Sequence, residues 1–252
     1  MTNESSAEQP FAGLTPDVVI ESLERLGIEC DGRLFALNSY ENRVYQVGVG
    51  AQEMRVLKFY RPGRWTDAQI LEEHAFAAEL VAADLVVSAP QIFGGSTLHH
   101  RGLLRFAVFP KLAGRAPELD GVDSLELLGR ALGRFHAVGS AGRFADRPSL
   151  SIERLGWSAR DALLDSPVVD GVIDEALIDR YAEVSAALLE KIETALESYG
   201  PWSSIRLHGD CHLGNILWSE TGPVFVDLDD CMTGPRIQDL WMLLSGSPDE
   251  QE

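Results

Sequence analysis

Apolar residues recur along the N-terminal third of the chain with two different periods. Between Pro16 and Leu26 they stand near helical spacing, with Thr15 as a candidate cap and Pro16 in the first turn. Short runs rich in β-forming residues then follow at 33–37, 43–47 and 55–60, separated by a polar segment and a glycine-containing turn. The pattern predicts a short opening helix followed by an antiparallel meander.

Helical periodicity dominates most of the remaining chain. A helix is predicted from Thr66 to Ala82, strand-like runs follow at Gln91–Phe93 and Leu103–Phe109, and the pattern becomes mainly helical from about Pro110. One later helix has its apolar residues at steps of three and four: Leu125, Leu128, Leu132, Phe135 and Val138. We therefore predict an α/β (α+β) chain with two lobes, an antiparallel-sheet lobe over residues 1–110 and a mainly helical lobe over residues 111–252.

The charge balance narrows the possible partners. The 252 residues include 21 Lys and Arg against 39 Asp and Glu, which gives a formal net charge of −18. Such a chain repels nucleic-acid phosphates and anionic membranes, so we expect neither as a partner. An acidic cleft would favour cationic small molecules or basic protein segments instead.

Targeting signals and cysteine usage point to the cytoplasm. The segment Met1 to Pro10 is polar and acidic, without the basic and apolar regions of a signal peptide. No apolar stretch approaches the ~18 residues of a membrane span. The cysteines at 30, 211 and 231 are too widely spaced for a disulfide framework or a zinc site. We expect a cytoplasmic protein.

The strongest chemical signal lies between Leu207 and Asp230. Asn215 stands five residues after Asp210, and Asp227 follows a second apolar run. Two strands joined by a turn at 220–223 would bring Asn215 and Asp227 together. Phosphoryl transfer needs a carboxylate that accepts or orients the hydroxyl proton, and oxygen ligands that hold Mg²⁺ against the nucleotide phosphates. Asp210 fits the first role, and Asn215 and Asp227 fit the second; Asp210 and Asp227 are the candidate catalytic residues.

A polar hairpin whose Asp and Asn residues serve turns is the alternative interpretation of this segment. For any single residue the turn is the simpler explanation. The joint order of His, Asp, His, Asn and Asp around two apolar runs favours the phosphotransfer site.

The segment His208 to Asn215 resembles the catalytic loop of the aminoglycoside phosphotransferase and choline kinase superfamily, whose fold is similar to that of the eukaryotic protein kinases. Further segments resemble the bacterial stress-response kinases within it: Leu37–Gln46, Leu57–Pro62, Arg64-Trp65, Ile70–His74 and Gln238–Met242. The resemblance covers most of the chain. It implies a two-lobed protein-kinase-like fold, with ATP bound by the N-terminal lobe. It also implies an enzyme that phosphorylates serine and threonine in proteins.

The resemblance also implies the residues that bind the nucleotide. Lys58 would contact the α- and β-phosphates, the alternative being a strand-edge lysine that faces solvent. Its carboxylate partner would be Glu73, which shares a helix face with the apolar residues, or else Glu72. Ser39 is the candidate for phosphate contact in place of a glycine-rich loop, although a hairpin turn explains it nearly as well. Adenine would lie at the hinge that begins at Phe109.

Residues around the catalytic loop receive supporting roles on the same basis. His208 would position the loop through hydrogen bonds, and Asp239 would accept backbone N–H groups from behind. His212 is open between an orienting, a substrate-facing and a packing role. Asp229 and Asp230 would assist the metal or bind a basic substrate, but a solvated acidic turn is the simpler interpretation.

The combined prediction is a kinase that moves the γ-phosphate of Mg-ATP to a hydroxyl, most favourably Ser or Thr of a protein in a bacterial stress response. The alternatives are a small-molecule kinase for an amino alcohol, sugar or aminoglycoside, and a nucleotide-sensing pseudokinase. We expect a monomer or a weak dimer. Since the chain ends at Glu252, soon after Leu244, where related proteins usually continue with more helices, we expect a short member of the family or a truncated C-terminal lobe.

Overall fold

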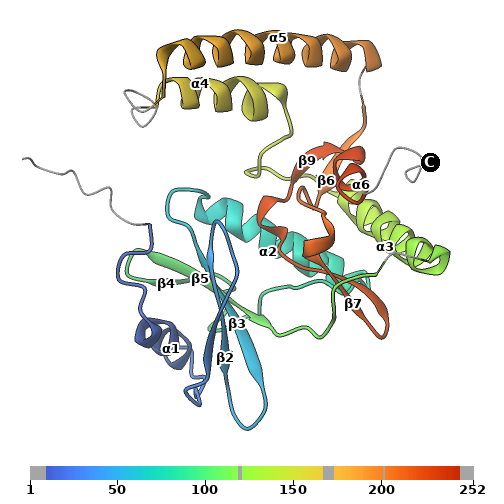
Figure 1. Ribbon diagram of the computed structural model, residues 1–252. Coiled ribbons are helices and arrows are strands. Elements are labelled where there is room, and N and C mark those ends of the chain that lie inside the picture. Colours follow the sequence, from blue (N-terminus) through green and yellow to red (C-terminus); the bar gives the residue numbers. More distant parts are fainter. Residues whose placement is uncertain (1–9, 119–120, 167–172, 201, 245–252) are drawn as a thin grey trace, which may run out of the picture.

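The computed structural model describes residues 10–118, 121–166, 173–200 and 202–244 (Figure 1). The expectations about a signal peptide and about the acidic C-terminal end fall mainly on residues outside these ranges. Strands form the N-terminal part and helices dominate the C-terminal part, so the predicted α/β class is confirmed. No helix in the described ranges combines the length and the hydrophobicity that crossing a membrane requires.

Five antiparallel strands form the sheet of the N-terminal part. They are β1 (Leu34–Leu37), β2 (Arg43–Gly48), β3 (Met54–Tyr60), β4 (His99–Arg101) and β5 (Leu104–Pro110). Their order across the sheet is β1-β2-β3-β5-β4, which places β3 in the centre. The predicted meander is confirmed as β1 to β3.

Two capped helices pack against this sheet. Helix α1 (Pro16–Glu24) begins after Thr15, whose side chain accepts a hydrogen bond from the N–H of Val18. Helix α2 (Asp67–Ala82) begins after Thr66, which forms a reciprocal capping box with Gln69. Such caps satisfy N–H groups that have no partner inside the helix. Both predicted helices are confirmed.

The helices cover opposite faces of the sheet. Leu57 and Phe59 of β3 belong to a buried cluster with α1, whereas Tyr60 belongs to a cluster with Ile70 of α2. Successive side chains of a strand point to opposite faces. Lys58, between Leu57 and Phe59, therefore lies on the α2 face.

The predicted strand at Gln91–Phe93 is wrong. Phe93 forms only an isolated bridge with Ser96, and Gly94 and Gly95 then turn the chain with positive φ angles. Pro90, which has no N–H to donate, precedes the run. The segment is too short between these two breaks to extend a ladder, and the next strand is β4.

The largest hydrophobic core joins α2 to the C-terminal part. Phe76 and Leu80 of α2 pack with Leu132 and Phe135 of α3 (Val122–Ala141). Leu125, predicted on the same face of this helix, is 52% exposed because it lies a turn before the core begins. Since α2 contributes to both parts, the division into 1–110 and 111–252 stays a prediction.

Two short antiparallel pairs of strands support the segment with the candidate chemistry. Strand β6 (Ser204–Leu207) pairs with β9 (Met232–Pro235), and β7 (Ile216–Ser219) pairs with β8 (Gly222–Phe225). The β7–β8 hairpin turns at the predicted place. The short helix α6 (Ile237–Trp241) follows β9.

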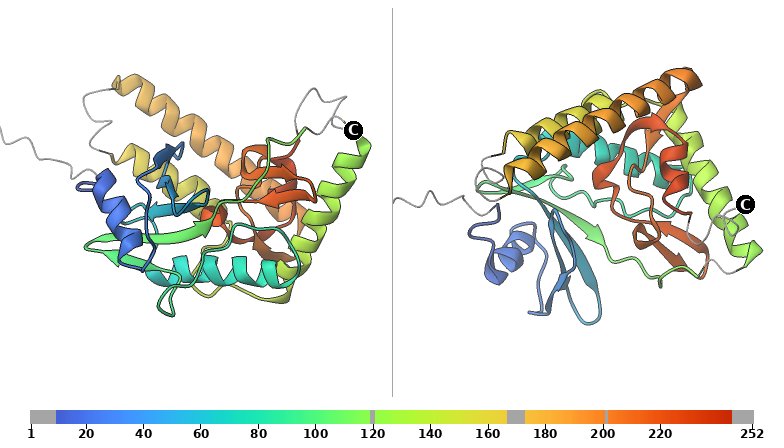
Figure 2. Two further views of the ribbon diagram at one scale, coloured as in Figure 1. Left: turned by 90° about the horizontal axis from the view of Figure 1, so that it is seen from below. Right: turned by 45° about the horizontal axis from the view of Figure 1, so that its top comes forward.

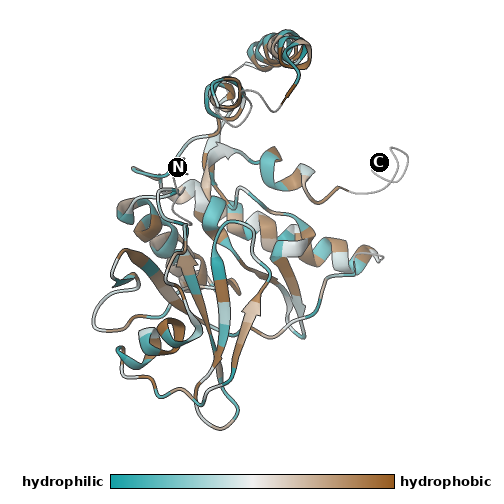
Figure 3. Cartoon of the chain, turned by 60° about the vertical axis from the view of Figure 1, so that its left-hand side comes forward, coloured by the Kyte–Doolittle hydropathy of each residue, from teal (hydrophilic) through white to brown (hydrophobic). Residues whose placement is uncertain are grey.

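A helical layer lies at one end of the molecule, away from the sheet (Figures 1 and 2). It consists of the π-helix η1 (Glu153–Trp157), α4 (Ser158–Leu164) and α5 (Glu175–Tyr199). Trp157 donates from Nε1 to Oε1 of Glu193 at 3.0 Å, which ties the start of this layer to α5. Figure 3 shows these helices nearly end-on, with polar and apolar residues around both of them.

Candidate active site

The loop after β6 is held from behind by Asp239 of α6. Its Oδ2 accepts from the N–H of His208 at 3.1 Å and lies 2.9 Å from Nε2 of His136, and its Oδ1 accepts from the N–H of Gly209 at 2.9 Å. Asp239 is fully buried. A buried carboxylate is stable when donors satisfy it, and here those donors fix the course of the loop. This is the contact expected of Asp239.

His208 and Gly209 join this loop to the segment after β8. Nε2 of His208 lies 3.0 Å from the carbonyl oxygen of Val226. Gly209 has a φ of +84°, and a Cβ added there would lie 2.1 Å from the carbonyl oxygen of Asp230. Only glycine meets both demands, so the two segments press together without a side chain between them.

Asp210 and Asn215 form a pair on the front of the loop. Nδ2 of Asn215 donates to Oδ2 of Asp210 at 3.0 Å and to its backbone oxygen at 2.9 Å. The intervening 3₁₀ turn η2 (Leu213–Asn215) brings Asn215 back toward Asp210. Because the amide nitrogen is used in this way, the amide oxygen of Asn215 is free to accept or to bind a cation.

Asp227 follows β8 in a strained conformation. The N–H of Val226 donates to the carbonyl oxygen of Asn215 at 3.0 Å, so the hairpin sets Asp227 beside Asn215. Asp227 has a φ of 57°, in the left-handed region of backbone conformation that residues other than glycine rarely adopt. Such strain is concentrated at functional sites. The two residues approach each other as the predicted hairpin requires.

Lys58 lies opposite, surrounded by carboxylates from two parts of the chain. Its Nζ is 2.9 Å from Asp227, 2.9 Å from Asp229 and 3.4 Å from Glu73. Burial by itself would lower the pKa of the ammonium, but the carboxylates raise that pKa well above its usual value. Lys58 is only 5% exposed, so a solvent-facing lysine at a strand edge is excluded.

Glu73, and not Glu72, is the carboxylate of α2 that faces Lys58. Burial raises the pKa of Glu73 to about 7, against the attraction of Lys58. Glu72 points elsewhere and accepts backbone N–H groups from the loop 145–147 at 2.6 to 2.8 Å. Although Glu72 is partly desolvated, these hydrogen bonds lower the pKa of its carboxyl. The two neighbours on α2 therefore have separate tasks.

The simpler interpretation of the acidic residues, a solvated turn, is wrong for Asp229 of the turn η3 (Leu228–Asp230), whereas the side chain of Asp230 stays 36% exposed. Asp229 is 2% exposed, and its Oδ2 lies 2.5 Å from Nη1 of Arg64. Nη2 of the same arginine lies 2.6 Å from Asp230. Although burial of Asp229 opposes it, the attraction of Lys58 and Arg64 lowers the pKa of this carboxyl to about 2. Asp229 is therefore buried and ion-paired, and Asp230 is ion-paired at the partly exposed end of the turn.

Two arginines of this region were missed by sequence reasoning. Arg64 precedes α2 and reaches η3, as described above. Arg147 donates from Nε to the carbonyl oxygen of Cys231 at 2.8 Å and stacks on Trp65 at 4.2 Å from the ring centroid. Arg64 belongs to a segment that carries the family resemblance but was given no role there, and Arg147 lies in no such segment, so only the folded structure identifies their partners.

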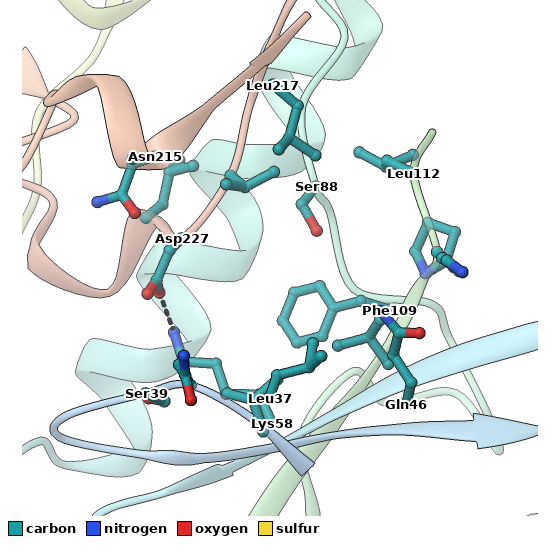
Figure 4. Close-up of a pocket in the computed structure, with 18 of the residues that line it drawn as sticks. Leu37, Ser39, Gln46, Lys58, Ser88, Phe109, Leu112, Asn215, Leu217 and Asp227 are labelled. Carbon is teal, nitrogen blue, oxygen red and sulfur yellow. Dashed lines mark hydrogen bonds and ion pairs between the residues drawn. The ribbon is translucent and has the colours of Figure 1, made fainter. Parts of the chain in front are cut away.

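A cleft of about 340 Å³ lies between the sheet and the β7–β8 hairpin (Figure 4). Ser39, Lys58 and Phe109 line one side of it, and Asn215 and Asp227 line the other. Apolar side chains make up much of the remaining lining of the cleft: Leu37, Val44, Val56, Leu112, Leu217 and Val226. Asp210 does not line the cleft itself but is bonded to Asn215 at its edge. An apolar slot that ends in charged groups is suited to a nucleotide.

Relatives of the chain are enzymes that transfer phosphate. Residues 34–252 match the phosphotransferase enzyme family. Stress response kinase A of Escherichia coli (strain K12) is 44% identical over 242 residues, which cover 96% of this chain and 71% of that protein. A Salmonella typhimurium protein named serine/threonine protein kinase RdoA is 43% identical over the same share of each chain.

Solved structures share the fold at low sequence identity. The amicoumacin kinase hAmiN, in complex with AMP-PNP, Ca²⁺ and Ami, superposes with a TM-score of 0.67 at 18% identity over 88% of this chain and 66% of that one. The microcompartment-associated aminopropanol kinase superposes with a TM-score of 0.63 at 22% identity over 91% and 74%. The kinase-like fold predicted above is confirmed.

Proposed function

The chain belongs to the phosphotransferase enzyme family, and from this premise we propose that it moves the γ-phosphate of ATP to a serine or threonine hydroxyl of a protein. One observation carries the proposal: Lys58 and Asp227 meet across a cleft whose edge holds the Asp210–Asn215 pair. The triphosphate would lie along Lys58, with Ser39 above it. The base would lie in the apolar slot beside the backbone at Phe109.

Asp210 is the candidate base. The acceptor oxygen forms a bond to the γ-phosphorus while the bond from that phosphorus to the β–γ bridging oxygen breaks, and ADP leaves with the electron pair. The hydroxyl proton passes to the carboxylate of Asp210, which is partly exposed and open to an acceptor.

The site has oxygen ligands that fit Mg²⁺. Asn215 offers its amide oxygen, since its nitrogen is bonded to Asp210, and Asp227 offers a half-exposed carboxylate. Mg²⁺ in nucleotide sites uses one or two protein oxygens and completes its shell with waters and phosphates. Among the described residues, no group of three or more His, Cys, Asp or Glu side chains could hold a metal ion. When bound, Mg²⁺ supplies charge neutralisation to the β- and γ-phosphate oxygens.

One observation favours a protein acceptor. The related Salmonella protein is named a serine/threonine protein kinase, and the similarity covers 96% of this chain. The net charge of −18 disfavours an anionic acceptor, and it suits basic protein segments and cationic small molecules alike. The two solved neighbours described above, whose names refer to small molecules, are 18% and 22% identical, so they support the fold and not the acceptor.

A transfer assay across acceptor classes tests the proposal. The protein is incubated with Mg²⁺ and γ-labelled ATP in the presence of itself, a basic protein, choline, a sugar or an aminoglycoside. We expect label on protein serine or threonine, with a loss of ~10²–10⁴ in rate for Asp210→Asn. Asp179→Asn on the exposed side of α5 is the matched control, and it should transfer like wild type.

Two results would overturn the proposal. Label that reaches only choline, sugars or aminoglycosides would exclude the protein acceptor. Transfer that continues unchanged in Asp210→Asn, with the melting temperature and nucleotide binding also unchanged, would remove Asp210 from the mechanism.

A further inference from the structure

The imidazole of His212 is held in one orientation by the loop that follows it. Its Nδ1 accepts a hydrogen bond from the N–H of Gly214 at 2.9 Å, just where the turn η2 begins. A backbone N–H can only donate, so Nδ1 has no proton in this arrangement. In the neutral ring the proton is then on Nε2, which becomes a donor.

Gly214 provides the space for this ring. A Cβ added at Gly214 would lie 2.6 Å from Cε1 and 2.8 Å from Nδ1 of His212. The φ angle of Gly214 is not among the positive ones, so close approach, and not backbone conformation, requires glycine here. Gly214 therefore holds the imidazole of His212 in place, through its N–H group and through the space that its missing side chain leaves.

The donor of His212 faces Asp210. Nε2 lies 3.5 Å from Oδ2 of Asp210, the same oxygen that accepts from Nδ2 of Asn215 at 3.0 Å. Asn215 thus donates to this carboxylate oxygen, and Nε2 of His212 faces the same oxygen. Among the residues that the structure describes, none donates a hydrogen bond to the other oxygen, Oδ1. The contact of Nε2 with Oδ2 is longer than a hydrogen bond, but catalytic hydrogen bonds are often long before substrate binds and shorten in the reacting complex.

We propose that His212 is a positioning residue for phosphate transfer, and this rests on the function proposed above. His212 and Asn215 hold Oδ2 of Asp210 between them and so turn Oδ1 toward the acceptor hydroxyl. The proton of that hydroxyl goes to Oδ1 as its oxygen bonds to the γ-phosphorus. Without His212 the carboxylate of Asp210 can rotate, and Oδ1 then points toward the acceptor hydroxyl for a smaller fraction of the time.

Two substitutions separate the two contacts of the ring. In His212→Asn the amide oxygen occupies the place of Nδ1 and can keep the Gly214 contact, but the side chain is too short to reach Asp210. In His212→Gln the amide N–H can reach toward the place of Nε2. A hydrogen bond to a charged group has a strength that corresponds to about 10- to 100-fold in rate.

We expect kcat of His212→Asn to fall about 10- to 100-fold, with the KM for ATP and the melting temperature close to wild type. His212→Gln should recover part of the lost kcat. His100→Asn, at an exposed histidine of the edge strand β4, is the matched control and should leave kcat unchanged.

Three results would overturn this assignment. A wild-type kcat in His212→Asn would limit His212 to capping the loop. A rise in the KM for the acceptor with kcat unchanged would make it a substrate-binding residue. A fall in kcat that is equal in both variants and matches a lower melting temperature would make its role structural. Transfer that is absent in wild type itself would overturn the proposed function, which distinguishes that failure from this one.

Discussion

Nζ of Lys58 lies 2.9 Å from Oδ1 of Asp227, although the two residues are 169 positions apart in the chain. Lys58 comes from the central strand of the sheet, and Asp227 comes from the loop after β8. The ion pair therefore joins the two walls of the cleft at the point where we place the phosphates.

Replacing Lys58 by Met should destabilise the protein as well as stop transfer. The ammonium pairs with the buried carboxylates of Glu73 and Asp229, and its loss leaves Glu73 without this ion pair and Asp229 with Arg64 alone. Removing one member of a buried pair costs about 3–5 kcal/mol. Urea unfolding measures this loss, with Lys191→Met on the exposed side of α5 as the control. A stability within ~0.5 kcal/mol of wild type would contradict the prediction.

Glu72→Gln and Glu73→Gln should have opposite signatures. Glu72 accepts N–H groups of the loop 145–147, so its substitution should lower the free energy of unfolding by about 1–3 kcal/mol and leave the ATP-induced melting shift intact. Glu73 positions Lys58, so its substitution should reduce the ATP-induced shift more than the stability. Thermal melting with and without Mg-ATP measures both effects. The reverse pattern would exchange the two assignments.

Gly139→Ala should be strongly destabilising, and Gly133→Ala on the same helix should not. A Cβ at Gly139 would lie 2.2 Å from the backbone oxygen of Arg206 in β6, whereas a Cβ at Gly133 would meet nothing within 4 Å. We expect a loss of about 2 kcal/mol or more at Gly139. At Gly133 we expect a gain of about 0.5–1 kcal/mol from helix propensity. Equal effects in urea unfolding would mean that α3 and β6 are not in close contact.

His74 should make the protein sensitive to acid. Burial lowers the pKa of this imidazole to about 3, and its ring contacts the hydroxyls of Tyr60 and Thr97 at 2.7 and 2.8 Å. Because the folded pKa is below the unfolded value, the stabilisation is complete above about pH 6.5 and is lost as the pH falls. Between pH 7.5 and pH 5 the loss from His74 is about 2 kcal/mol.

Comparison with His74→Gln isolates this contribution. Burial raises the folded pKa of Glu73 to about 7, so its contribution is present at low pH and lost as the pH rises through 7, which opposes His74. Glu73 is present in both proteins, whereas only wild type loses the contribution of His74 on acidification. The difference in free energy of unfolding between wild type and the variant should therefore be smaller at pH 5 than at pH 7.5. If the free energy of unfolding, measured in urea, changes with pH in parallel for the two proteins, the imidazole of His74 is not held in its uncharged form in the folded protein.

Local patterns in the sequence determined most of the secondary structure. Thr15, Pro16 and Thr66 stand where capping chemistry starts helices, and α1 and α2 begin there. The β7–β8 hairpin followed from two apolar runs around a turn, and with it the approach of Asn215 to Asp227. The strand predicted at Gln91–Phe93 was wrong, because a run of three residues between a proline and two glycines is too short to distinguish a strand from a turn.

Long-range partners were decided only by the tertiary structure. The sequence by itself determined which residue types could transfer phosphate, and it named Lys58, Asp210, Asn215 and Asp227 through their motifs. It did not determine that Asp229 is buried between Lys58 and Arg64, or that His212 faces Asp210. Charge and polarity along a chain favour an exposed acidic turn. Which charges pair in the interior depends on the packing of segments more than 160 positions apart, as for Arg64 and Asp229, separated by 165.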